Sequence, residues 1–264
     1  MTGERGMGDC GCEAPAAAGA AVDAGTRIEA AAEAAALDPL AERVRIELFA
    51  LADADLRTFN AGLIPTMPEE RIIGVRMPAL RKLVSRLDKE GAGKAYLAAC
   101  PHAFLEEGEL CGLIINRERA YDAAVRKLEE FLPHVDNWAT CDLLKPSAFN
   151  DRPEGLEEQA FSWMRSGRTY TVRFGVEVLM NFFLDEGFRT TQLDQAAAVP
   201  AGEYYVEMAV AWYFATALAK RWDETVPYLE ERRLPAATHA RAIQKARESY
   251  RITPEQKAYL RTLK

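Results

Sequence analysis

Apolar residues recur at helical spacing along almost the whole sequence, and turn residues interrupt them at short intervals. The stripe in residues 77–91 has four members at positions i, i+3, i+4 and i+7, namely Leu80, Leu83, Val84 and Leu87. Pro78 stands where a first-turn proline belongs, and Gly91 follows the last apolar residue. This combination predicts an amphipathic helix with a defined beginning and end.

The same stripe recurs in ten further segments. These are residues 40–60, 107–118, 121–131, 137–145, 155–166, 170–184, 204–220, 224–231, 237–249 and 254–263. Alternating patterns typical of strands are essentially absent, and only the short run 71–76 is ambiguous. The sequence therefore predicts an all-α protein. Its regular cadence favours helix pairs stacked as an α-α superhelix, a solenoid of HEAT-like repeats.

The first 38 residues differ from the rest of the sequence in composition. Residues 1–38 are rich in Ala and Gly and contain almost no large apolar residue before Leu37. We expect a disordered tail there, followed by one HEAT-like helical domain over residues 39–264. The tail has no continuous apolar segment of the kind found in secretory signals, and no stretch approaches the length of a membrane span. These features predict a cytoplasmic protein that meets no membrane.

The five cysteines are irregularly spaced: Cys10, Cys12, Cys100, Cys111 and Cys141. An odd number without a repeated spacing favours structural thiols in a reducing compartment over a disulfide framework. Cys10 and Cys12 have no His or Cys partner nearby in the sequence, so we expect no metal site. The three histidines show no ligand or catalytic pattern; they are His102, His134 and His239.

Charge is distributed unevenly along the chain. The formal net charge is −7, but residues 232–264 contain nine Lys or Arg and two Glu, a local charge of +7. Local charge decides whether a surface can bind phosphates, so Lys245, Arg247 and Arg251 are candidates for contact with a nucleic-acid backbone. A solvated pair of C-terminal helices is the alternative explanation.

Four chemically unusual residues fall on three successive predicted helices. Trp138 and Asp142 share one helix face, Arg173 follows 35 residues after Trp138, and Trp212 follows 39 residues later. Aromatic faces hold cations, and a carboxylate stabilises an oxocarbenium-like centre and orients a water molecule. Such a set suits a base alkylated on a ring nitrogen, which carries positive charge and leaves its sugar as a neutral base.

Each of these residues also has an ordinary structural explanation. Trp138 and Trp212 are typical of packing in a core or groove. Asp142 fits a partly exposed structural acid. Arg173 and Glu177 stand at i and i+4, which is the spacing of a common helix ion pair.

The sequence resembles the AlkD-type DNA alkylation-repair glycosylase family, which is built of HEAT-like helical repeats. Five segments carry the resemblance: IIGVRMPALRKL (72–83), DNWATCDLL (136–144), TYTVRFGVEVLMNFFLDE (169–186), YYVEMAVAWYFATALAK (204–220) and ARAIQKARESYR (240–251). Together they sample most of residues 45–251. The resemblance implies a DNA-repair hydrolase that excises cationic N3- and N7-alkylpurines from duplex DNA, as a monomer and without a metal or organic cofactor.

The resemblance also implies roles for individual residues. Asp142 corresponds to the catalytic carboxylate, Trp138 and Trp212 to an aromatic cleft around the deoxyribose, and Arg173 to a contact with the DNA backbone near the lesion. Members of the family place a tyrosine in the first repeat facing this cleft, whereas residues 60–68 contain no aromatic residue here. We therefore keep two alternatives: a HEAT-like protein that binds distorted or branched DNA without catalysis, and a scaffold that binds protein.

Overall fold

The computed structural model describes residues 38–264, which form fourteen α-helices and three short 3₁₀ helices and contain no strand. This confirms the prediction of an all-α protein. The predicted disordered tail falls outside the described residues, apart from Asp38. That residue caps the first described helix, because its carboxylate accepts the backbone N–H of Leu40 at 2.8 Å.

The elements follow one another in this order: α2 (Pro39–Ala50), α3 (Ala54–Leu63), η1 (Glu69–Arg71), α4 (Met77–Lys89), α5 (Gly93–Ala99), α6 (Leu105–Ile115), α7 (Tyr121–Phe131), η2 (Leu132–His134), α8 (Trp138–Asp142), η3 (Ser147–Phe149), α9 (Leu156–Met164), α10 (Thr169–Phe182), α11 (Thr190–Ala197), α12 (Tyr204–Lys220), α13 (Trp222–Glu230), α14 (Ala236–Glu248) and α15 (Pro254–Thr262). None of the helices within residues 38–264 combines the length and apolarity that crossing a bilayer requires.

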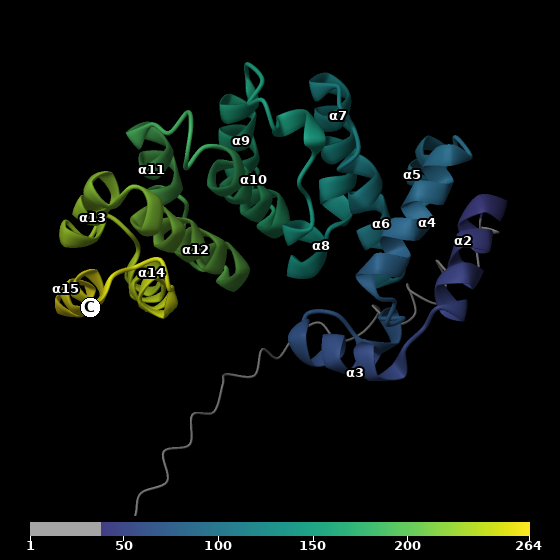
Figure 1. Ribbon diagram of the computed structural model, residues 1–264, viewed down its shortest axis with the longest axis horizontal. Coiled ribbons are helices and arrows are strands. Elements are labelled where there is room, and N and C mark those ends of the chain that lie inside the picture. The colour runs from purple at the N-terminus through teal and green to yellow at the C-terminus, as the bar shows by residue number, and fades with distance from the viewer. Residues whose placement is uncertain (1–37) are drawn as a thin grey trace, which may run out of the picture. The chain divides into compact units, whose positions relative to one another are not determined.

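The helices of residues 38–264 stack in chain order as a helical-repeat solenoid (Figure 1). We call α4, α6, α8, α10, α12 and α14 the first row, because each contacts the next. The intervening helices pack against this row: α5 and α7 on α6, α9 on α10, and α11 and α13 on α12. The three helices that carry Trp138, Arg173 and Trp212 are therefore consecutive members of the first row.

The prediction of one continuous helix over residues 40–60 is wrong, because the chain breaks there into α2 and α3. Asp53 makes the break: its carboxylate accepts the N–H of Leu56 at 3.1 Å, and its own N–H donates to the carbonyl of Gly74 at 2.9 Å. Gly74 has a φ of +89°, and a Cβ on it would lie 2.3 Å from the Asp53 carbonyl oxygen. Only glycine fits this contact.

The ambiguous run 71–76 is neither helix nor strand beyond the end of η1. Its backbone is held by one buried side chain, Glu106 of α6, whose carboxylate accepts the N–H groups of Ile73, Gly74 and Val75 at 2.9, 2.7 and 3.2 Å. A buried backbone segment needs such partners, since each unpaired N–H would be costly. This single carboxylate therefore fixes the path of the chain into α4.

Helices α9 and α10 approach each other closely at Gly175. A Cβ on that residue would lie 2.7 Å from the carbonyl oxygen of Ala160 and 2.8 Å from Cγ of Met164. The missing side chain lets α9 pack directly on the backbone of α10. This packing fixes α10, the helix that carries Arg173, from the side opposite the site.

Candidate active site

An ion cluster joins α8 to α10 at the position that the sequence singles out. Nε and Nη2 of Arg173 donate to the two carboxylate oxygens of Asp142 at 2.7 and 2.8 Å, a bidentate pair. Nε also lies 3.0 Å from Oε1 of Glu177, and Nη1 donates to the carbonyl of Tyr205 at 2.9 Å. We call Asp142, Arg173 and Glu177 the ion cluster.

Burial differs sharply among the three members of the ion cluster. The side chain of Asp142 is 20% exposed, that of Arg173 7% and that of Glu177 2%. Burial, and then the neighbouring Asp142, raise the pKa of Glu177 well above its usual range. Burial alone would lower the pKa of Arg173, but its bonds to Asp142 and the charge of Glu177 outweigh that effect and raise it. Asp142 is thus the member that solvent reaches.

Trp138 begins α8, the short helix that ends at Asp142. Its N-cap is Asn137, whose side-chain oxygen accepts the N–H of Thr140 at 2.8 Å. The indole Nε1 of Trp138 donates to the carbonyl of Leu63 at 3.1 Å. The ring is half-buried against an apolar group formed by Ile64, Met67, Ile72 and Leu105. The segment without an aromatic residue therefore still contacts the site, through a backbone carbonyl.

Trp212 lies on α12 and is 40% exposed. It lines a groove of about 540 Å³ together with Met180, Asn181, Ala215, Thr216, Ala219, Lys220, Lys245, Glu248, Ser249 and Arg251. We call this the tryptophan groove. It brings Trp212 together with two of the three cations proposed for a phosphate backbone, Lys245 and Arg251.

The third proposed cation, Arg247, lies elsewhere. It follows Lys245 by two residues on α14, and two residues rotate an α-helix by about 200°, so the side chains leave opposite sides of the helix. Arg247 is half-buried there. The tryptophan groove therefore contains Lys245 and Arg251 but not Arg247.

The ion cluster and the tryptophan groove lie on the same pair of helices. Near their beginnings, Arg173 of α10 contacts Tyr205 of α12; further along, Met180 of α10 contacts Thr216 of α12. Trp212 follows Tyr205 by seven residues, which is about 10 Å along a helix. A ligand with the dimensions of a few nucleotides can contact both.

Two tyrosines beside the ion cluster, Tyr170 and Tyr205, were not predicted from the sequence. Tyr170 precedes Arg173 by one helical turn, and its ring centroid lies 5.8 Å from that of Tyr205. Tyr170 is buried, and its pKa is raised to about 12 mainly by burial. The spacing of Tyr170 and Arg173 could have indicated that the two lie together, since residues i and i+3 share a helix face. Tyr205 could not be found in this way, because it contacts Arg173 through its backbone carbonyl.

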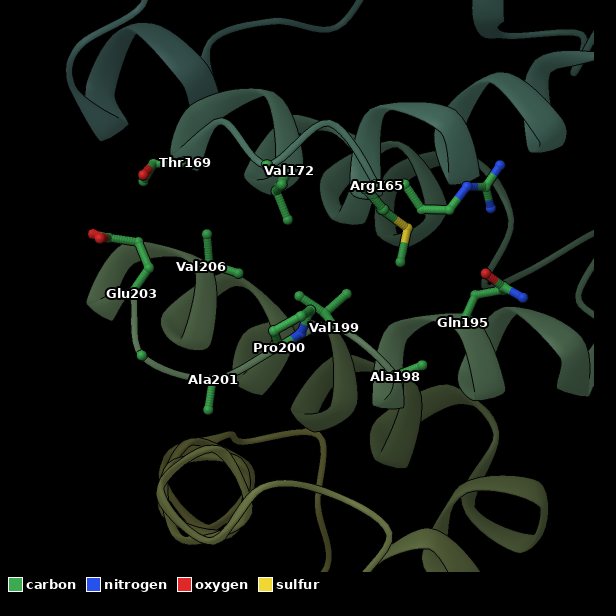
Figure 2. Close-up of a pocket in the computed structure, with 13 residues that line it drawn as sticks. Arg165, Thr169, Val172, Gln195, Ala198, Val199, Pro200, Ala201, Glu203 and Val206 are labelled. Atoms are coloured by element: carbon green, nitrogen blue, oxygen red, sulfur yellow. The ribbon is translucent and has the colours of Figure 1, made fainter.

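A further pocket in the described residues lies away from the ion cluster. It has a volume of about 630 Å³ and lies between the α9–α10 turn and the segment from α11 to the start of α12. Figure 2 shows Thr169 and Glu203 at one end and Arg165 and Gln195 at the other, with Val172, Val199 and Val206 between them. Its walls are mostly small apolar side chains, and it holds no acid–base pair in contact, so we assign it no chemistry.

One group of possible metal ligands includes the two acidic members of the ion cluster. Ligand atoms of Cys141, Asp142 and Glu177 lie within 4.8 Å of one another. The Arg173 guanidinium already binds both carboxylates, and a second cation there would be repelled. The Cys141 thiol donates to the carbonyl of Tyr170 at 3.4 Å, and burial raises its pKa. This group does not fit a metal ion.

Glu109 of α6 provides a test of the electrostatics near α8. It stands one turn beyond Leu105, which packs near Trp138, and burial, then Glu106, raise its pKa to about 8. A carboxyl whose pKa rises on folding holds its proton more tightly in the folded state. Stability is therefore lost as pH rises from 4.5 to about 8.

We expect Glu109→Gln to raise the free energy of unfolding above about pH 8 by roughly 1–2 kcal/mol, after allowance for solvent screening. Below pH 4.5 the variant and the wild type should be nearly equal. Urea unfolding across this pH range measures both. The exposed Glu70→Gln serves as the control and should change neither; identical pH profiles for Glu109→Gln and wild type would contradict the assignment.

Comparison with known proteins places the chain in a family. Residues 44–248 match the model of a family described as DNA alkylation repair enzyme. The match covers most of the chain and contains Trp138, Asp142, Arg173 and Trp212. Neither the curated proteins nor the solved structures that were searched gave a significant match.

Proposed function

The chain belongs to the DNA alkylation repair enzyme family, and on that basis we propose that it is a DNA glycosylase acting on positively charged N3- and N7-alkylpurines in duplex DNA. It hydrolyses the N-glycosidic bond as the first step of base excision. The protein acts in this proposal as a cytoplasmic monomer, associated with the bacterial nucleoid when it meets DNA. No metal or organic cofactor takes part in bond cleavage.

The observation that carries the proposal is that the Asp142 carboxylate is held in a fixed orientation and is still reached by solvent. A bidentate bond to a buried arginine fixes its carboxylate, yet the side chain is 20% exposed. A carboxylate offers about four lone-pair positions, so two bonds from Arg173 leave capacity for a further partner. The orientation is therefore set before any ligand binds, which is the arrangement that favours stabilisation of a developing positive charge.

The chemistry needs little beyond this carboxylate. An N3- or N7-alkylated purine carries positive charge, so it departs as a neutral base without a general acid. As the bond breaks, the deoxyribose gains oxocarbenium character, which the negative charge of Asp142 stabilises. The same carboxylate orients or deprotonates the water that attacks the sugar carbon. In this proposal, Trp138 and Trp212 supply the aromatic faces that contact the deoxyribose.

In this proposal Arg173 positions Asp142 rather than binding DNA directly. Its guanidinium nitrogens already donate to Asp142 and Tyr205, and the group is buried. The backbone contact then belongs to Lys245 and Arg251, which flank Trp212 in the tryptophan groove. Arginine and lysine side chains are common hydrogen-bond donors to the phosphate oxygens of DNA.

The test is release of 7-methylguanine and 3-methyladenine from N-methylated duplex DNA by the purified wild-type protein. We expect release well above the spontaneous rate, and the same DNA without alkylation should yield no free base. Release no faster than the spontaneous rate, from protein that binds the duplex, would overturn the glycosylase proposal.

That result would favour non-catalytic binding of distorted or branched DNA. Two observations support this second candidate. Residues 60–68 offer no aromatic side chain to the site, and the Trp138 indole N–H is engaged by Leu63. A competition assay between four-way junctions and linear duplex discriminates the two, since only the second candidate requires a preference for branched DNA.

The salt dependence of DNA binding tests the tryptophan groove. Lys245→Gln with Arg251→Gln should lower the magnitude of the slope of log K against log salt by about 1.8, since each lost phosphate contact removes about 0.9. Arg247→Gln, a charge change on the other side of α14, should leave the slope unchanged. Fluorescence anisotropy at several salt concentrations measures all three proteins. Equal slopes in the double variant and wild type would exclude Lys245 and Arg251 from the footprint.

A further inference from the structure

A second group of ligating side chains lies between α5 and α6, outside the ion cluster. It consists of Cys100 directly after α5, His102 in the connecting loop, and Cys111 in α6. Their sulfur and imidazole nitrogen atoms all lie within 4.8 Å of one another. From this convergence we propose that Cys100, His102 and Cys111 bind a zinc ion.

The spacing within the cluster fits a tetrahedral zinc ion. Sγ of Cys100 and Nδ1 of His102 are 3.5 Å apart. Zinc binds thiolate at about 2.3 Å and imidazole nitrogen at about 2.0–2.1 Å, so two such ligands at a tetrahedral angle lie about 3.5 Å apart. Two thiolates and an imidazole are also a donor set that favours zinc over magnesium or calcium.

The backbone of His102 is held in an unusual conformation. Its φ is +51°, in the left-handed region that L side chains rarely adopt. Arg71 fixes the loop from one side by donating to the carbonyls of His102 and Ala103 at 3.2 and 2.8 Å. Glu107 fixes it from the other, accepting the N–H groups of Ala103 and Phe104 at 2.9 and 3.2 Å. Strain that surrounding contacts maintain is typical of functional positions, and here it directs the imidazole towards Cys100.

The thiol chemistry agrees with this assignment. Zinc binds the thiolate form of cysteine, so Cys100 releases its thiol proton when the ion binds. The second thiol, Cys111, is fully buried, and its proton leaves when the metal binds.

A cavity reaches the cluster from the solvent side. It has a volume of about 370 Å³ and is lined by Cys100, His102, Glu130 and His134, among others. The His134 ring stacks on that of His102, with centroids 4.5 Å apart and planes 8° apart. Three protein ligands leave one tetrahedral position for water, and this cavity gives that water access.

The proposed zinc ion would stabilise a series of contacts that extends to the start of α8, near the ion cluster. Besides holding the loop at His102, Arg71 pairs with Asp136 at 2.7 Å, just before α8. Zinc bound at Cys100, His102 and Cys111 would cross-link the end of α5 to α6. It would thereby fix the loop whose carbonyl groups accept the hydrogen bonds of Arg71.

The experiment measures zinc binding by the full chain, reduced and stripped of metal, with no DNA present. All proteins carry Cys10→Ser and Cys12→Ser so that these thiols do not contribute. We expect about one equivalent of zinc by equilibrium dialysis and elemental analysis, and a thiolate-to-cobalt charge-transfer band when cobalt replaces zinc. Zinc should also protect Cys100 and Cys111 from alkylation, as peptide mass spectrometry would show.

Three variants locate the site. Cys100→Ser and His102→Asn should bind almost no zinc at the same free concentration; asparagine tolerates the left-handed backbone, so this variant removes the ligand without adding strain. Cys141→Ser is the matched control, another buried thiol, and should still bind one equivalent. No binding by the parent protein overturns the proposal, and so does binding that survives both substitutions or that fails equally in Cys141→Ser. A Cys100–Cys111 disulfide in a protein that binds no zinc after reduction would also overturn it.

Discussion

Replacing Asp142 with asparagine is expected to lower the rate of 7-methylguanine release by roughly 10²- to 10³-fold, the usual cost of losing one aligned electrostatic contact to a transition state. The amide has the same shape and can still accept a hydrogen bond from Arg173. It lacks the negative charge that stabilises the oxocarbenium-like sugar in the proposed mechanism. Single-turnover assays on N-methylated duplex, with enzyme in excess, measure the chemical step directly.

DNA affinity provides the internal control for this variant. Asp142 carries negative charge, so its neutralisation removes no attraction to phosphate, and affinity should stay within about twofold of wild type. Asp136→Asn is the matched substitution, since that carboxylate also lies beside α8 but pairs with Arg71. It should retain release at the wild-type rate. Undiminished release by Asp142→Asn would remove Asp142 from the mechanism, whatever the affinity.

The second large effect is expected on stability. Arg173→Met leaves the Asp142 carboxylate without its counter-charge, next to the buried side chain of Glu177. Breaking a buried ion pair in this way should lower the free energy of unfolding by about 3–5 kcal/mol. Urea denaturation measures it. Arg43→Met breaks the exposed pair with Glu90 instead, and should cost less than about 1 kcal/mol.

A compensating variant distinguishes lost charge pairing from lost packing. Adding Glu177→Gln to Arg173→Met removes the most deeply buried acid, whose raised pKa already marks its charge as unfavourable there. The double variant should therefore recover part of the stability lost by Arg173→Met. A double variant no more stable than Arg173→Met would mean that the guanidinium acts through packing alone.

Most helices with a clear apolar stripe could be predicted from the sequence, and their bounds shift by three residues or fewer. Segment 204–220 coincides with α12, and 121–131 with α7. The apolar pattern does not predict α5 or α11, because both are short and contain few large apolar residues. The apolar pattern also continues past Asp53, because it shows which face of a helix is apolar but not where an N-cap residue ends one helix and begins another.

The proximity of Asp142 and Arg173 could be predicted from the sequence, but the way they pair could not. Spacing indicates that Asp142 and Arg173 lie on successive helices, but nothing in it shows that the two bind each other through both carboxylate oxygens. Charge counting groups Arg247 with Lys245, although their spacing of two residues already separates them on a helix. The Cys100–His102–Cys111 group depends on one left-handed residue, which no periodicity reveals.

The first row gives this protein a particular mechanical character. Each of its helices contacts the next one along, so most of the packing joins segments that are close in sequence. Such a stack can unfold locally, one helix–helix interface at a time, starting from either end. The α8–α10 junction lies in the interior of the row, where neighbours on both sides must separate first, whereas α14 and α15 are near an end. We therefore expect slow amide exchange to persist longest at the α8–α10 junction and to disappear earliest at α14 and α15, beside the proposed phosphate contacts.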